Sequence, residues 1–138
     1  MSKSEETVRS WWSAFFEAGS KGKDGDWSKC QAIVTEDFRF VRPTGNPLGM
    51  SGFIDMMSME GMSFDSSEII EINKVHEGTD SGIVCVTSHD KFTYKGTPND
   101  DICVITFYTV KDDQGSWKIA WGQRSTGRKP EDERPSGF

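Results

Sequence analysis

The stretch Ile83–Gly127 constrains the fold more than any other part of the sequence. It contains three long runs rich in β-branched and aromatic residues, separated by turn-forming residues at 95–100 and 113–114. Runs bounded by such turns predict three consecutive strands joined by hairpins. The stretch also contains one of the two histidines and both tyrosines. We therefore expect it to define the fold and to supply part of any pocket.

The length and the net charge of the sequence limit the classes of protein to which the chain can belong. Its 138 residues suffice for one domain, which buries roughly two thirds of the surface that the unfolded chain exposes. We expect this domain to span residues 1–127, followed by a charged tail at 128–138. The net charge of −6 argues against a nucleic-acid partner, because phosphate backbones are bound by basic surfaces.

The sequence also lacks the patterns of membrane segments, secretory signals and metal sites. The sequence has no apolar run of roughly 18 residues, and its first residues lack the apolar segment of a secretory signal. We therefore expect a cytoplasmic protein with no membrane partner. Cys30, Cys85 and Cys103 lack the spacing of a metal site and are interpreted as free buried thiols. No cluster of histidine, cysteine and acidic residues predicts a metal site, and no cofactor is expected.

The N-terminal part of the chain predicts three helices. Ser4, followed by two acidic residues, is the predicted N-cap of the first, which should end near Gly19. Apolar residues at helical spacing predict that this helix has one wide buried face: Val8, Trp11, Trp12, Phe15 and Phe16. Asp26 is the predicted cap of a second, shorter helix, and Ser51 of a third over Gly52–Met59.

Two further strands are predicted around the third helix. A short strand at Phe38–Arg42 is expected to end at Pro43, which lacks a backbone N–H. A longer one should run from Ser67 to about His76, where the apolar period is two. In the short strand Arg42 lies two and four residues after Phe40 and Phe38, so that it points to the same face as these apolar residues. It is therefore expected to point inward, where it meets an anionic ligand or pairs with an internal acid.

Pairing the hairpins divides the long strands into two faces. A turn centred within 97–98 places Thr106 opposite His89, and a turn centred on 113–114 places Trp121 opposite Thr106. A one-residue slip in either turn would change every pair. One predicted face contains Thr87, His89, Lys91, Val104, Thr106, Tyr108, Ile119, Trp121 and Gln123, and the other contains Asp90, Phe92, Cys103, Ile105, Phe107, Ala120, Gly122 and Arg124.

Both predicted faces are substantially apolar, unlike those of an antiparallel sheet with one side in water. Each face therefore needs cover. The helices can cover one face. For the other we expect a second copy of the chain, so that the partner prediction is a homodimer through the outer face of the sheet.

The order of these elements resembles the nuclear transport factor 2-like superfamily, in particular its SnoaL-like branch. The resemblance covers nearly the whole chain and rests on helix, helix, short strand and helix, followed by a curved sheet of four strands. Local matches are Glu36-Asp37-Phe38 and Trp117-Lys118-Ile119, and the loops at 42–47 and 95–101 look like those of an uncharacterised subgroup. It implies an α+β fold, a cone-shaped curved antiparallel sheet wrapped around three N-terminal helices, usually dimeric and with an apolar pocket.

The resemblance does not choose an activity, because the superfamily includes cyclases, isomerases, dehydratases and proteins that only bind or oligomerise. Some of its enzymes have an acid two positions after the hydrophobic residue of the last strand. Gln123 stands there, two residues after Trp121, and an amide is no general base. Isomerase-type sites pair a carboxylate with a tyrosine. Asp90 with Tyr94 or Tyr108 would supply these groups, but Asp90 is predicted on the opposite face from Tyr108.

Two hypotheses of function follow. The first is a dimeric cone that binds a small apolar or anionic ligand, with these lining residues: Trp12, Phe16, Phe40, Arg42, Phe53, Met57, Thr106 and Trp121. The second is a cofactor-independent lyase, isomerase or cyclase in which His89 is the general acid/base and Gln123, Tyr108 or Arg42 orients an anionic intermediate. The structural alternative for His89 is a histidine satisfied by a hydroxyl such as that of Thr106.

Overall fold

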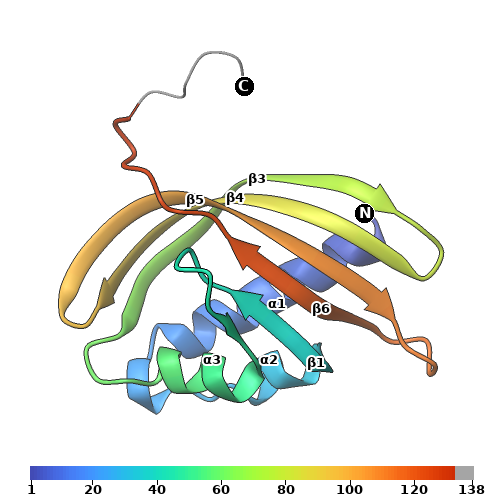
Figure 1. Cartoon of the computed structure of the whole chain (residues 1–138), viewed down its shortest axis with the longest axis horizontal. Helices are drawn as coiled ribbons and strands as arrows, with labels where there is room; N and C mark the ends of the chain where they lie inside the picture. The colour runs from blue at the N-terminus through green and yellow to red at the C-terminus, as the bar shows by residue number, and fades with distance from the viewer. Residues whose placement is uncertain (133–138) are drawn as a thin grey trace.

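The computed structural model describes residues 1–132 and has an α+β fold, in which one curved six-stranded sheet folds over the helices (Figure 1). The strand order is β2-β1-β6-β5-β4-β3. In chain order the elements are α1 (Lys3–Gly19), the 3₁₀ turn η1 (Gly22–Asp24), α2 (Ser28–Ala32), β1 (Val34–Val41), β2 (Pro47–Leu48), α3 (Met50–Met57), β3 (Ser63–Glu77), β4 (Ser81–Tyr94), β5 (Thr97–Lys111) and β6 (Trp117–Arg124). The predicted three helices and cone-shaped curved sheet are confirmed.

The first helix begins two residues earlier than predicted. Its N-cap is Ser2, whose hydroxyl accepts a hydrogen bond from the Glu5 N–H at 3.1 Å. Ser4 lies inside the helix instead, fully buried, and its hydroxyl donates to a Glu77 carboxylate oxygen at 2.6 Å. This bond ties the start of α1 to the end of β3. The predicted end at Gly19 is confirmed.

The turn between β4 and β5 is tighter than the sequence indicated. Lys95 and Gly96 have φ angles of 51° and 80°, which are typical of a two-residue type I′ hairpin turn. The predicted centre within 97–98 is therefore wrong, and the register shifts by four residues. His89 pairs with Ile102 rather than Thr106. Because the shift is an even number, residues of the two strands that were predicted to share a face still do so.

A bulge in the pairing of β5 with β6 changes the face of one predicted residue. Tyr108 pairs with Trp121, whereas the next residue, Thr109, pairs with Ile119. The extra residue turns Ile119 to the inner face, where it is fully buried. Its predicted place beside Trp121 is therefore wrong.

The inner, concave face of the sheet contains the core. Along β4 every second residue from Gly82 to Asp90 is buried, which is the alternation of a strand with one covered face. At the centre of β5, Phe107 is fully buried, and its ring lies 5.5 Å from that of Trp11 and 6.2 Å from that of Trp12. The aromatic face of α1 therefore packs directly on the concave face.

The ends of the sheet differ from the simple antiparallel arrangement. The first strand is longer than predicted, and it pairs with β6 in parallel, so the sheet is mixed. After β6 the chain runs back along β5, where Arg128 forms a bridge with Ile102. Residues 133–138 of the predicted tail lie outside the described residues.

All three cysteines are free, as predicted, although Cys85 is only half-buried and pairs with Thr106.

Removing the ring at the centre of the core tests this packing. We expect Phe107→Ala to lower the free energy of unfolding by about 3–5 kcal/mol, because the cavity would lie beneath two tryptophans. Urea denaturation measures the change. Ile70→Ala is the matched control, since Ile70 is 52% exposed on β3 and its loss should cost within about 0.5 kcal/mol. Equal effects of the two variants would contradict the assigned inner face.

Candidate functional site

The core contains an unfilled cavity of about 250 Å³ between the helices and the concave face of the sheet. Its walls are mostly aromatic rings and methionines, and its polar groups come from the loop after β1 and from β3 to β6. The lining residues are Trp11, Trp12, Phe15, Phe40, Arg42, Pro43, Thr44, Phe53, Met56, Met57, Met62, Phe64, Ser67, Asp90, Phe92, Tyr94, Asn99, Ile105 and Arg124. A cavity of this size within an aromatic core is the usual form of a small-molecule site.

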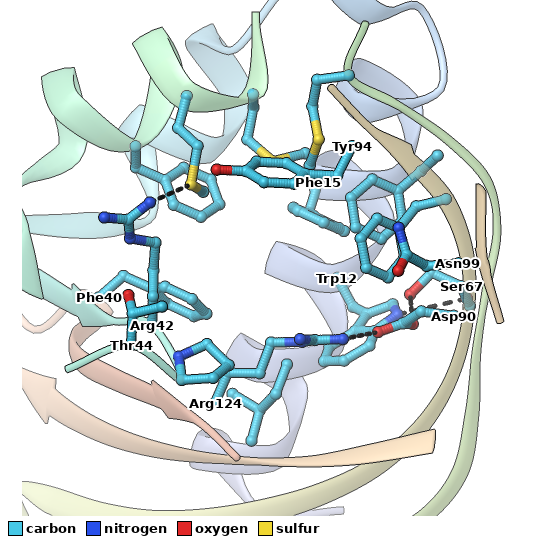
Figure 2. A pocket seen from close by; sticks show the side chains of 18 of the residues that line it. Trp12, Phe15, Phe40, Arg42, Thr44, Ser67, Asp90, Tyr94, Asn99 and Arg124 are labelled. Carbon is cyan, nitrogen blue, oxygen red and sulfur yellow. Dashed lines mark hydrogen bonds and ion pairs between the residues drawn. The ribbon is translucent and has the colours of Figure 1, made fainter. Parts of the chain in front are cut away.

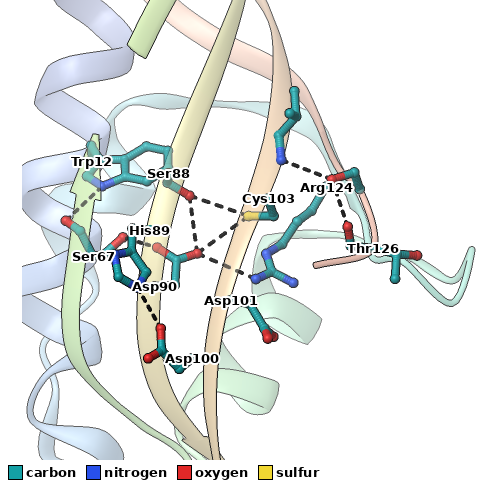
Figure 3. Close-up of polar contacts among 12 residues, drawn as sticks. Trp12, Ser67, Ser88, His89, Asp90, Asp100, Asp101, Cys103, Arg124 and Thr126 are labelled. Carbon is teal, nitrogen blue, oxygen red and sulfur yellow. Dashed lines mark hydrogen bonds and ion pairs between the residues drawn. The ribbon is translucent and has the colours of Figure 1, made fainter. Parts of the chain in front are cut away.

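One side of the cavity is formed by a buried carboxylate and its hydrogen-bond donors (Figure 3). Asp90 is 2% exposed, and its Oδ1 accepts a hydrogen bond from the Ser67 hydroxyl at 2.7 Å. Its Oδ2 accepts from the Ser88 hydroxyl at 3.2 Å and the Cys103 thiol at 3.5 Å. Both oxygens are therefore occupied by donors of the protein itself.

Arg124 supplies the positive charge that this buried carboxylate needs. Its Nη2 lies 3.5 Å from Asp90 Oδ2, and its guanidinium group stacks over the Phe92 ring at 5.5 Å from the centroid. An ionised carboxylate in an apolar interior is costly unless it is paired. Burial also raises the pKa of the neighbouring Cys103 thiol to about 11, so that this group remains a neutral donor at physiological pH.

Arg42 is the second cation of the cavity, and it has no such partner. Its Nη1 contacts Met56 Sδ at 3.6 Å, and its Nε is buried without a hydrogen-bond acceptor. No carboxylate of residues 1–132 forms a salt bridge with it. Figure 2 shows Arg42 across the cavity from the Asp90–Arg124 pair, with the Tyr94 hydroxyl pointing to the side where Arg42 lies.

The three predicted catalytic residues do not line this cavity. Their strand positions place His89, Gln123 and Tyr108 on the outer, convex face, opposite to Asp90. His89 Nε2 pairs there with Asp100 Oδ1 at 2.5 Å. The expectation that His89 faces a pocket is therefore wrong, because even-numbered residues of β4 occupy the concave side. The Thr106 hydroxyl that was expected to satisfy it contacts the Cys85 thiol instead.

The predicted ligand-binding residues divide between the two faces. Those that line the cavity are Trp12, Phe40, Arg42, Phe53 and Met57. Phe16 packs against the core from outside the cavity, and Thr106 and Trp121 lie on the outer face. The placement of Phe16 follows from the helix geometry, because the cavity lies over the neighbouring Trp12 and Phe15 rather than over the edge of the apolar face.

Sequence reasoning left out most of the polar side of the site. Ser67 and Asn99 were not proposed as ligand contacts, and Asp90 was set aside because of its face. One usable signal was present: Asp90, Phe92 and Tyr94 have the same parity on one strand. A charged residue in register with buried aromatic residues indicates an inward carboxylate.

The outer face of the sheet has a shallow hollow of its own. It is lined by Asp37, Arg39, Ile83, Thr106, Tyr108, Ala120 and Trp121. Around it, Val104, Tyr108 and Trp121 are 39%, 41% and 38% exposed. Large apolar side chains in adjacent positions of neighbouring strands form a continuous patch, which is typical of an interaction surface.

Two other kinds of site receive no support from the described residues. No group of three or more histidine, cysteine or acidic side chains within residues 1–132 is placed to hold a metal ion. Among the helices of the same range, none is long and apolar enough to cross a membrane.

The fold and the enclosed cavity define a protein of the nuclear transport factor 2-like (NTF2-like) superfamily. The chain belongs to the family described as "Protein of unknown function (DUF3804)", whose pattern matches residues 6–131. Comparison with the curated proteins gives no match.

Solved structures agree with this assignment. An NTF2-like protein of unknown function from Prochlorococcus sp. NATL2A is 38% identical, with a TM-score of 0.75 over 94% of this chain and 96% of that one. A ketosteroid isomerase-like protein from Erwinia carotovora atroseptica is 23% identical, with a TM-score of 0.69 over 91% and 94% of the two chains. An NTF2-like protein of unknown function in nutrient uptake from Rhodospirillum rubrum is 17% identical, with a TM-score of 0.70 over 88% and 93%. The last two show the fold alone.

The buried carboxylate can be tested through stability. We expect Asp90→Ala to lower the free energy of unfolding by about 3–5 kcal/mol, because it leaves the guanidinium of Arg124 in the core without its counter-ion. Urea denaturation at pH 7 measures this. Asp100→Ala is the matched control: its carboxylate is 51% exposed and pairs with His89 on the outer face, so its loss should cost less than about 1 kcal/mol. If Asp90→Ala cost no more than the control, the buried pair would not stabilise the fold.

Proposed function

We propose that the protein binds a small molecule whose apolar body occupies the cavity beneath the concave face. The observation that supports this most directly is the unfilled space itself. Protein interiors are normally packed to crystal-like density, yet here about 250 Å³ remains among aromatic side chains of the core. Leaving such space costs stability, which a binding function explains and packing alone does not.

Binding explains the polar groups better than catalysis does. A general base needs a lone pair directed at the substrate, whereas both carboxylate oxygens of Asp90 already accept hydrogen bonds from Ser67, Ser88, Cys103 or Arg124. The Asp90–Arg124 pair is therefore better suited to form a fixed polar part of the cavity wall than to react with a substrate.

An isomerase-type reaction is the second candidate. It is favoured by one observation, that Asp90 and Tyr94 line the same cavity and so supply a carboxylate and a phenol to one ligand. The likeness to a ketosteroid isomerase-like protein is compatible with it. In this version Asp90 replaces His89 as the general base, and Oδ1, which accepts one hydrogen bond from Ser67, is the oxygen that would take the proton.

Closing the mouth of the cavity tests the binding proposal. Thr44 is exposed and lines the cavity, whereas Asn46, in the same loop, is exposed and does not. We expect the wild type and Asn46→Trp to bind the neutral probe 3-phenylpropanamide in isothermal titration calorimetry. Thr44→Trp should weaken this binding about tenfold or more, because an indole at the mouth takes space that the probe needs to enter and occupy the cavity.

Two results would count against the proposal. One is the absence of any heat of binding for the wild type at millimolar probe. The other is equal binding by the two tryptophan variants, which would place the probe outside the cavity.

We further propose that two copies associate through their outer sheet faces. The exposed Tyr108 and Trp121, with Val104 beside them, form an apolar patch on a face that the helices leave uncovered. Aromatic residues at the centre of a patch are the usual anchors of a protein interface. A two-fold arrangement would place each patch against its own counterpart.

A charge in this patch should separate the two copies. We expect the wild type to sediment as a dimer at micromolar concentration and Trp121→Lys as a monomer, since the ammonium group would be buried without a partner. Ile70→Lys, at an exposed position on β3 outside the patch, should remain dimeric. Sedimentation of the wild type as a monomer at this concentration would refute the interface.

A further inference from the structure

We propose that the ligand of the cavity is a monocarboxylate with an aromatic or aliphatic body, and that Arg42 binds its carboxylate. This inference rests on the proposed binding function and specifies its ligand. The observation behind it is the contrast between the two guanidinium groups of the same cavity, one with a counter-ion and the other without.

The hydrogen bonds of Arg42 are the first step of the argument. Among residues 1–132 its buried Nε has no acceptor, and the side chain forms one hydrogen bond, from Nη1 to the thioether sulfur of Met56 at 3.6 Å. A buried donor without a partner destabilises a fold, and the effect is larger when the group is charged. An incoming carboxylate would accept from Nε and from a neighbouring Nη in the two-bond geometry that guanidinium groups favour.

The charged groups that line the cavity indicate the sign and the size of the charge that the ligand carries. They are the carboxylate of Asp90 and the guanidinium groups of Arg124 and Arg42. Because Asp90 and Arg124 pair with each other, one positive charge remains. A single carboxylate neutralises it. A phosphate monoester would bring close to two negative charges into walls that are otherwise apolar, at a high cost in desolvation.

The positions of the groups give the ligand an orientation. Arg42 directly follows the last residue of β1 and precedes the exposed loop residues Pro43 and Thr44, which also line the cavity. The charged end of the ligand therefore lies toward the loop. Its body extends past Phe40 and over the aromatic face of α1, as the arrangement in Figure 2 allows.

Two matched probes distinguish the contribution of the ligand's charge to the affinity from the contribution of its apolar body. 3-Phenylpropionate and 3-phenylpropanamide have the same ring and chain and differ in the end group, which is a charged carboxylate in one and a neutral amide in the other. By isothermal titration calorimetry at pH 7, we expect the wild type to bind the acid about tenfold or more tightly than the amide, as a charge-assisted pair requires. Arg42→Gln should remove this preference and leave binding of the amide unchanged.

Two further variants complete the design. Arg42→Lys keeps the charge but not the planar fork, and should retain part of the preference. Arg39→Gln makes the same change of net charge three residues earlier, at an exposed position on the outer side of β1, and should retain all of the preference. Thermal unfolding of each variant verifies the fold, and the partial loss of preference in the lysine variant still tests the role of Arg42 if the glutamine variant does not fold.

The failures of the two proposals are distinct. If the wild type binds neither probe, the binding function itself is refuted. If it binds both probes with similar affinity, or if Arg42→Gln keeps the preference for the acid, the cavity binds ligands but Arg42 does not recognise a carboxylate.

Discussion

The packing of one aromatic helix face on the concave side of the sheet is the interaction on which the rest of the structure depends. Trp11 and Trp12 on α1 meet Phe107 at the centre of β5. A sheet that curves this strongly cannot be filled along its whole width by one helix. Space therefore remains between α1, α3 and the strands that carry Asp90 and Arg124, and the cavity is a consequence of the same curvature that forms the core.

Much of the fold followed from the sequence because hydrophobic period and helix caps are local signals. The pairing of β4 with β5 was harder, because Pro98 and the polar residues after it are typical turn formers. The structure instead turns at Lys95–Gly96 and keeps Pro98 inside β5. This end of β5 tolerates a proline because Pro98 lies beyond β6 and beyond the bridge between Ile102 and Arg128, so that β4 is its one strand neighbour among residues 1–132.

The site was less predictable than the fold, since both faces of the sheet contain apolar side chains and period alone does not say which one is concave. The choice of the face with His89 and Trp121 was wrong for the cavity. The helices and β1 lie near their predicted positions, although their ends and N-caps differ, and this is why Trp12, Phe40 and Arg42 were found. Asp90 was weighed but set aside because of its predicted face, and its hydrogen-bond donors could not be predicted because they come from four different strands and no local pattern encodes such a cluster.

The central claim is that the cavity binds an organic acid through the unpaired guanidinium of Arg42. A crystal structure of the protein with 3-phenylpropionate tests it most directly. The account predicts the phenyl ring among the aromatic walls, the carboxylate accepting hydrogen bonds from Arg42 Nε and Nη, and the Asp90–Arg124 pair intact. An empty cavity, or a carboxylate bound to Arg124 in place of Asp90, would contradict it.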